Sequence, residues 1–127
     1  MKKIISTKKA PDAIGPYNQA TAFENLVFTS GQIALNPETM EIVEGGVQEQ
    51  TRVVMDNLKA VLEEAGSSYD KVLKTTCYLS DMDNFAAFNE IYGEYFSADD
   101  APARATVAVK TLPKNVLVEV DAIAFKN

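Results

Sequence analysis

The stretch VLVEVDAIAF, residues 116–125, alternates two kinds of side chain along what reads as a single β-strand. Small aliphatic residues occupy every second position, at Val118, Val120, Ala122 and Ala124. The positions between them mix apolar residues with two acids: Leu117, Glu119, Asp121, Ile123 and Phe125. Successive side chains of a strand point to opposite faces of a sheet, so one face of this strand suits burial under helices and the other does not.

Two helical segments precede this strand. Apolar residues recur at intervals of three and four over residues 47–65, which predicts a helix with one buried face and Gly66 as its left-handed cap. A second helix is expected over residues 81–96, with Asp81 or Asp83 at its N-cap and an aromatic stripe. Other segments read as strands: 2–7, 19–34 with a turn at Glu24 and Asn25, 70–79 and 105–110. No linker or repeat interrupts the pattern, so residues 1–127 are expected to form one domain.

The second face of the strand at 116–125 needs a cover that the chain does not supply. Two helices can cover only one side of such a sheet, which leaves Leu117, Ile123 and Phe125 exposed. Another copy of the same sheet would bury these side chains. The pattern therefore predicts a homo-oligomer.

Composition excludes several classes of function. The chain has 127 residues, a net charge of −6 and no histidine, which removes Ser-His-Asp and Cys-His catalysis and imidazole metal sites. No glycine-rich phosphate loop is present, and the lysines are not clustered beside aromatic residues. We therefore expect no metal, no cofactor and no nucleic-acid partner, and chemistry that rests on carboxylate, hydroxyl, guanidinium and backbone groups.

Two features bear on the cellular location, and the single cysteine is interpreted separately. No apolar run approaches the roughly 20 residues that cross a bilayer, so no membrane partner is expected. The basic N-terminal segment lacks the apolar centre of a signal peptide, which favours a cytoplasmic location. The single cysteine, Cys77, lies in a predicted strand and is interpreted as a small core residue.

One arginine in the segment PARATV, residues 102–107, stands out in an otherwise apolar run. Arg104 is either a surface residue paired with Asp99 or Asp100, or a functional cation. It shares strand parity with Thr106, and Glu119 falls on the same side if strands 105–110 and 116–125 pair through the turn between them. Two interpretations stay open. Arg104 and Glu119 form a salt bridge at a subunit interface, or Arg104 binds the carboxylate of a ligand in a bidentate way while Glu119 binds and activates a water molecule.

Longer motifs identify a resemblance that covers nearly the whole chain in order. They are IGPYNQA (14–20), TSGQIALNPETMEI (29–42), QTRVVMDNLKAVLEEAG (50–66), PARATV (102–107) and VEVDAIA (118–124). Together they resemble the RidA/YjgF family of enamine and imine deaminases. The resemblance implies an α+β, chorismate-mutase-like fold: a mixed β-sheet with two helices packed on one face, forming a homotrimer with ligand clefts between subunits.

The same resemblance implies an activity. Family members resembling RidA hydrolyse 2-aminoacrylate, 2-iminopropanoate and 2-iminobutanoate to 2-oxo acids and ammonia without a metal or another cofactor. On this chain the carboxylate-binding arginine corresponds to Arg104, and the backbone N–H of Thr106 supplies a second donor. Some relatives have cysteine where this chain has Thr106, so thiol chemistry is impossible here. Glu119 corresponds to the acid that positions and deprotonates the attacking water.

Four further residues match the family's cleft. Tyr17 and Ser30 correspond to its polar catalytic residues, and Gly31 and Asn89 to substrate-binding positions. From the residues alone, Tyr17 is equally a capped core or interface tyrosine, Ser30 an ordinary turn residue, and Asn89 a buried structural amide on the aromatic stripe. Relatives often have serine or valine where this chain has Asn18, which leaves the edge of the cleft undefined.

Two other classes of function remain open at this stage. A regulatory protein could bind a small carboxylate in the same cleft without turnover, and it would tolerate Glu119→Gln. Action on RNA or as a holdase is also suggested by some relatives, although the acidic balance and the lack of histidine disfavour nuclease chemistry.

Overall fold

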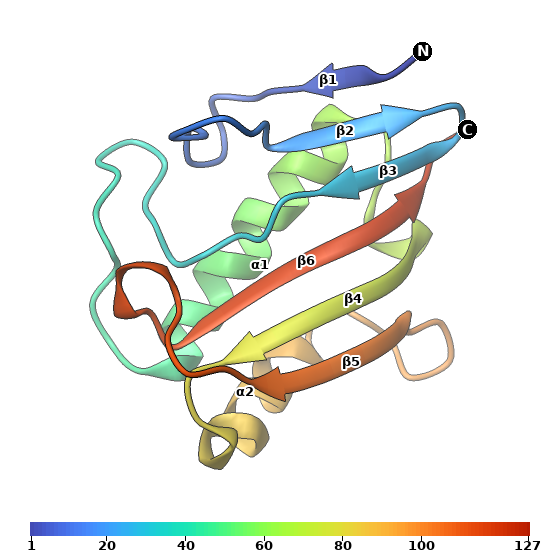
Figure 1. The fold of residues 1–127 in the computed structure, drawn as a ribbon. Helices are drawn as coiled ribbons and strands as arrows, with labels where there is room; N and C mark the ends of the chain where they lie inside the picture. The colour runs from blue at the N-terminus through green and yellow to red at the C-terminus, as the bar shows by residue number, and fades with distance from the viewer.

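Six strands form one mixed sheet in the computed structural model, which describes residues 1–127 (Figure 1). The strands are β1 (Lys3–Ile5), β2 (Ala20–Phe23), β3 (Leu26–Thr29), β4 (Val72–Leu79), β5 (Ala103–Ala108) and β6 (Val118–Phe125). Their order across the sheet is β1-β2-β3-β6-β4-β5. All neighbours pair antiparallel except β4 and β5, which run parallel. The expected mixed α+β fold is thus confirmed.

Both helices, α1 (Val47–Glu64) and α2 (Phe85–Tyr92), lie on the same side of this sheet (Figure 1). Helix α1 matches the segment predicted from apolar spacing and is followed by Gly66, whose φ of 85° is the left-handed conformation expected of a helix cap. None of the helices is both long and apolar enough to span a bilayer.

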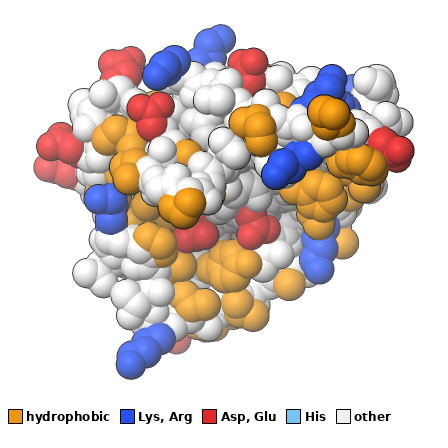
Figure 2. All heavy atoms as spheres, turned by 45° about the horizontal axis from the view of Figure 1, so that its top comes forward, with side chains coloured by type: hydrophobic (Ala, Val, Ile, Leu, Met, Phe, Trp, Pro, Cys, Tyr) orange, Lys and Arg blue, Asp and Glu red, His pale blue; other side chains and the backbone are white.

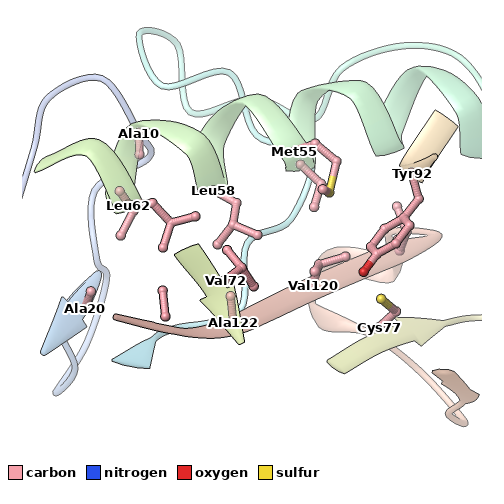
Figure 3. Packing of buried hydrophobic residues seen from close by; sticks show 14 of the residues in the cluster. Ala10, Ala20, Met55, Leu58, Leu62, Val72, Cys77, Tyr92, Val120 and Ala122 are labelled. Atoms are coloured by element: carbon pink, nitrogen blue, oxygen red, sulfur yellow. The ribbon is translucent and has the colours of Figure 1, made fainter. Parts of the chain in front are cut away.

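The hydrophobic core lies between α1 and the sheet (Figure 3). Met55, Leu58 and Leu62 point from the helix toward Val120 and Ala122 of β6, and all five side chains are buried. Such burial contributes roughly 1.5–3 kcal/mol for each large aliphatic side chain. The small face of β6 therefore packs under the helix as its alternation predicts.

Cys77 belongs to the same core. Its side chain is fully buried on β4, and burial raises the pKa of its thiol to about 11. A thiol that stays protonated at neutral pH is a poor nucleophile. The interpretation of Cys77 as a core residue is confirmed.

The second helix is shorter than its sequence pattern indicated. A 3-10 turn (η2, Met82–Asn84) comes first, and Asp81 accepts a hydrogen bond from the Asp83 backbone N–H at 2.8 Å, which makes Asp81 the cap. The helix proper ends at Tyr92, before Gly93, a residue of low helix propensity. The aromatic residues beyond it pack instead in a turn, where Phe96 meets the ring of Tyr69 edge-on at 5.0 Å.

The expected pairing of the last two strands is wrong. The connection from β5 to β6 is short, yet β6 pairs with β3 and β4, and β4 lies between β6 and β5. The chain crosses over β4 through a loop that contains the 3-10 turn η3 (Pro113–Asn115). Strand β5 is therefore an edge strand with one unpaired side, and most of its residues are exposed.

The face of the sheet away from the helices is uncovered. Its apolar members at the β1–β3 end keep 40–52% of their side-chain surface exposed: Ile4, Phe23, Leu26 and Phe28. Figure 2 shows hydrophobic side chains gathered around acidic ones on the visible surface. We call this surface the open face; it also carries the alternate residues of β6, including Glu119 and Asp121.

Candidate functional site

Arg104 and Glu119 lie on opposite faces of the sheet, contrary to the expectation from the sequence. Arg104 pairs in register with Thr75, whose side chain is buried under the helices. Glu119 pairs with Tyr78 on the open face. Residues directly opposite in neighbouring strands share a face. The expectation failed because it assumed that β5 and β6 are neighbours, whereas β4 separates them.

Arg104 is held in place by residues of α2. Its guanidinium carbon lies 4.7 Å from the ring centroid of Tyr92 and 5.5 Å from that of Phe85, and Nη1 donates to Asn89 Oδ1 at 2.6 Å. These four residues form the arginine cluster. Cation–π contacts and one neutral amide orient the guanidinium without neutralising it.

No carboxylate pairs with Arg104. The ion pairs of the chain are Lys8–Asp12 and Arg52–Glu94, so the expected alternative of a surface pair with Asp99 or Asp100 is wrong. Asn89 is exposed, which also excludes the buried structural amide that was its alternative interpretation. The exposed guanidinium keeps donors free for an incoming planar anion.

Thr106 follows Arg104 on the same side of β5. Its hydroxyl oxygen is buried and has no hydrogen-bond partner in the chain, and the residue pairs in register with Cys77. Because the Thr106 hydroxyl is not accessible from the surface, it cannot contact a ligand there. The backbone N–H of Thr106 is therefore the group of this residue that could donate to a ligand carboxylate.

Glu119 lines a cavity of about 540 Å³ at the end of the sheet where β6 begins. The walls of this Glu119 cavity come from four parts of the chain: Pro11, Asp12, Ile14, Tyr17, Gln19, Ser30, Gly31, Gln32, Ile33, Leu35, Pro113, Lys114 and Glu119. The structure thus brings together Tyr17, Ser30, Gly31 and Glu119, as the resemblance implied. It does not bring Arg104, Asn89 or Thr106 to them.

Glu119 lies directly over the backbone of Gly31. A Cβ atom placed on Gly31 would stand 2.7 Å from Cδ and 2.9 Å from Cγ of Glu119, closer than real contacts allow. The absence of a side chain at Gly31 therefore lets the Glu119 carboxyl group lie at this position, and a larger residue would displace it. The bridge between Gln32 and Val120 ties this segment to β6.

The surroundings of Glu119 raise the pKa of its carboxyl group. Partial burial, and secondarily the charge of Asp121 two residues along the same face, raise the pKa of Glu119. Burial also raises the pKa of Asp121, although the Tyr78 hydroxyl donates to Asp121 Oδ2 at 3.3 Å. An elevated pKa suits a carboxylate to general acid–base work near neutral pH.

Tyr17 and Ser30 are fixed by a small network of hydrogen bonds. The Ser30 hydroxyl donates to Asn18 O at 2.5 Å, and the Tyr17 hydroxyl accepts from the Ile14 N–H at 3.3 Å. Tyr17 is half exposed, which excludes the core tyrosine that was its alternative interpretation. The side chain of Gln19 is buried and donates to the carbonyls of Ala10 and Pro11. These bonds fix the loop that precedes Tyr17.

One wall of the cavity has no counterpart among the predicted site residues. Pro113 and Lys114 belong to the turn η3, which was interpreted only as a connection between strands. In Figure 1 this loop lies beside the segment that follows β3. Two consecutive left-handed residues form the turn, and the local sequence signal for that conformation is weak, since asparagine at position 115 tolerates it but lysine at position 114 does not favour it.

Comparison with known proteins places this geometry in a family. A family model described as "Endoribonuclease L-PSP" matches residues 7–126. A RutC family protein of Pyrococcus abyssi is 53% identical over 98% of each chain. The 2-iminobutanoate/2-iminopropanoate deaminase of Mus musculus is 44% identical over 99% of this chain and 93% of the mouse protein.

A solved structure shows the same fold. Escherichia coli TdcF, crystallised with bound serine, superposes with a TM-score of 0.91 at 43% identity, covering 98% of this chain and 99% of TdcF. Similarity of this extent, over nearly the full length, demonstrates common family membership. The chain belongs to the RidA/YjgF family.

Proposed function

We propose that this protein is a cofactor-independent hydrolase of small 2-imino acids, working at clefts between the subunits of a homotrimer. The observation that carries the proposal is the arginine cluster: an exposed guanidinium, oriented by two aromatic rings and an amide, with no carboxylate of its own. Such a group suits bidentate recognition of a substrate carboxylate. The similarity to the mouse deaminase supports the same reaction.

Each step of the reaction has a candidate residue. Arg104 binds the carboxylate, assisted by the Thr106 N–H. Glu119, as a carboxylate, accepts a proton from water while the water oxygen bonds to the carbon of the protonated imine, and the C=N electron pair moves to the nitrogen, which becomes an amine. Glu119 then returns that proton to the nitrogen. The C–N bond breaks and ammonia leaves, while the hydroxyl oxygen forms the C=O of the 2-oxo acid and gives its own proton to the Glu119 carboxylate. Tyr17, Ser30 and the Gly31 backbone line the reacting end.

The separation of the two groups requires a second subunit. Arg104 and Glu119 lie two strands apart, roughly 10 Å across the sheet, at positions whose partners on β4 are three residues apart, and on opposite faces. No single substrate of this size can contact both in one chain. We infer that the arginine cluster of one subunit, at the edge strand β5, faces the Glu119 cavity of the next.

The open face supports the oligomer. Ile4, Phe23, Leu26 and Phe28 form an apolar surface that one chain leaves in water. Burying it against other copies gains about 25 cal/mol for each Å² of apolar surface. A closed cyclic trimer would repeat the same contact three times and leave no copy uncovered.

RNA cleavage, which the description of the family model names, has weaker support. The chain carries a net charge of −6, and the Glu119 cavity contains one cationic side chain. Phosphate backbones are bound chiefly by concentrated Lys and Arg residues. These charges favour a small anion over a polynucleotide.

The direct test is the rate of 2-oxo acid formation from 2-iminopropanoate and 2-iminobutanoate generated in situ. Wild type should accelerate it over the uncatalysed rate, and Arg104→Ala should lose at least about tenfold in kcat/KM, which is roughly 1.4 kcal/mol. Arg52→Ala, which removes an exposed arginine paired with Glu94, is the matched control and should keep full activity. A folded wild type that binds a 2-oxo acid without turnover would establish a binding protein instead.

A further inference from the structure

We propose that the Glu119 cavity accepts 2-imino acids whose side chain ends in an acidic group, and that Lys114 is the residue that binds this group. The proposal rests on the function proposed above and extends it to a substrate class. Three observations carry it: the charges of the residues that line the cavity, the backbone conformation of Lys114, and the volume of the cavity.

The charge of the cavity points to an anion at its η3 wall. Lys114 is the one cation among the lining residues, and it forms no ion pair. The two lining acids are differently placed: Asp12 is solvent-exposed and lies 3.9 Å from Lys8, and Glu119 is assigned to the water. An exposed ammonium without a partner is free to bind a carboxylate from outside the chain.

The backbone holds Lys114 at this wall in a costly conformation. Lys114 and Asn115 have φ values of 56° and 57°, in the left-handed region; asparagine tolerates this region, but a lysine rarely adopts it. Strain of this kind persists where the surrounding structure fixes it, and it is frequent at ligand sites.

Three anchors fix the turn. Leu112 and Val116 are buried on either side of it, the Asn115 N–H donates to Leu112 O at 3.0 Å, and the Leu117 N–H donates to Gln50 Oε1 at 2.8 Å. Gln50 is itself buried in α1. The turn is thus tied to the helix layer, and Lys114 is presented by a fixed support.

The size of the cavity leaves room for a longer substrate. Its volume of about 540 Å³ lies within the range that holds ligands much larger than 2-iminobutanoate. Ile14, Leu35 and Pro113 supply apolar wall that suits the methylene groups of a side chain. A substrate with its imine at Glu119 would therefore pass apolar surface before its terminal group meets Lys114.

The experiment compares imines generated in situ from L-glutamate and L-glutamine, which have the same number of non-hydrogen atoms and differ in terminal charge. Wild type should hydrolyse the acidic imine with a kcat/KM about tenfold higher, or more, than that for the neutral imine. Lys114→Met should lose that preference by slowing the acidic imine alone, and Lys114→Arg should retain it. Unfolding temperatures of the variants verify that all three proteins are folded.

Other outcomes overturn the proposal. Equal rates for the two imines in wild type, or an equal loss for both in Lys114→Met, would show that Lys114 does not select the acidic group. Hydrolysis of 2-iminobutanoate by wild type shows separately that the proposed function holds. If no imine is hydrolysed, calorimetric binding of 2-oxoglutarate against its neutral 5-amide makes the same comparison: equal affinities contradict the role of Lys114, and an affinity difference lost in Lys114→Met supports it.

Discussion

Arg104 and Glu119 project from opposite faces of one sheet, because β4 separates the strands that carry them. Each residue is positioned by its own surroundings. Tyr92, Phe85 and Asn89 orient the guanidinium of Arg104, and Glu119 lines the cavity. Neither group forms a site by itself. Under the proposed function, the unit that performs the chemistry is a pair of neighbouring subunits, and each chain contributes the arginine cluster to one cleft and the Glu119 cavity to another.

The pH dependence of the reaction should report the environment of Glu119. Glu119 must be ionised to accept a proton from water, so kcat/KM falls as the pH drops through its pKa. Burial and Asp121 raise that pKa, so the fall should be centred above the value of about 4.3 that an ordinary glutamate has. Glu119→Gln should reduce kcat about a hundredfold or more at neutral pH.

Asp121→Asn tests the second cause of this shift. Removing the charge of Asp121 should lower the pKa of Glu119, so the acidic limb of the kcat/KM profile should move to lower pH. Glu90→Gln removes an exposed carboxylate on α2 and serves as the control, which should leave the profile in place. An acidic limb that does not move in Asp121→Asn would show that another group controls it.

Gly31→Ala should displace the carboxyl group that lies above it. The added methyl group would overlap the end of the Glu119 side chain, and misplacement of a catalytic group by about 1 Å can cost a hundredfold in rate. We expect kcat to fall roughly 10–100-fold while the unfolding temperature changes little. Gly46→Ala is the matched control, because a Cβ there would meet its neighbour Glu49 at an ordinary 3.6 Å. Full activity in Gly31→Ala would contradict the assigned position of Glu119.

Phe28→Glu should dissociate the oligomer. Phe28 lies on the open face among other exposed apolar residues, and a charge there would be buried without a partner in the assembly. Sedimentation should show wild type as a trimer and Phe28→Glu as a folded monomer without hydrolase activity. Met82→Glu, at a similarly exposed residue outside the sheet, should remain trimeric. A trimeric Phe28→Glu would place the interface elsewhere.

Local patterns predicted the elements and faces of the fold well. The alternation of residues 118–125 matches the observed burial residue by residue, because strand geometry alone determines which side chains share a face. The apolar spacing of residues 47–65 likewise identified α1. The helix expected over 81–96 was too long, since aromatic residues mark a buried stripe whether they lie in the helix or in the turn that follows it.

Pairings between distant segments were beyond the reach of local patterns. The short connection between β5 and β6 suggested neighbours, yet the chain passes over β4, and the choice between these paths depends on packing across the whole sheet. The wrong pairing placed Arg104 beside Glu119. The resemblance to a family identified both residues, but only the sheet order showed that they occupy different faces. The left-handed turn at Lys114 was missed for a related reason, because its anchors come from α1 as well as from its own flanks.

The measurement that tests the shared site most directly is the activity of mixed trimers. Arg104→Ala and Glu119→Gln, each strongly impaired alone, are co-expressed with different tags, and trimers that contain both are purified and assayed. If each cleft combines Arg104 of one subunit with Glu119 of the next, every closed ring that contains both variants has one intact cleft of three, so the purified mixed trimers should show about a third of the wild-type activity. If the two residues act within one subunit, every cleft lacks one of them, and mixed trimers that stay inactive would contradict the account.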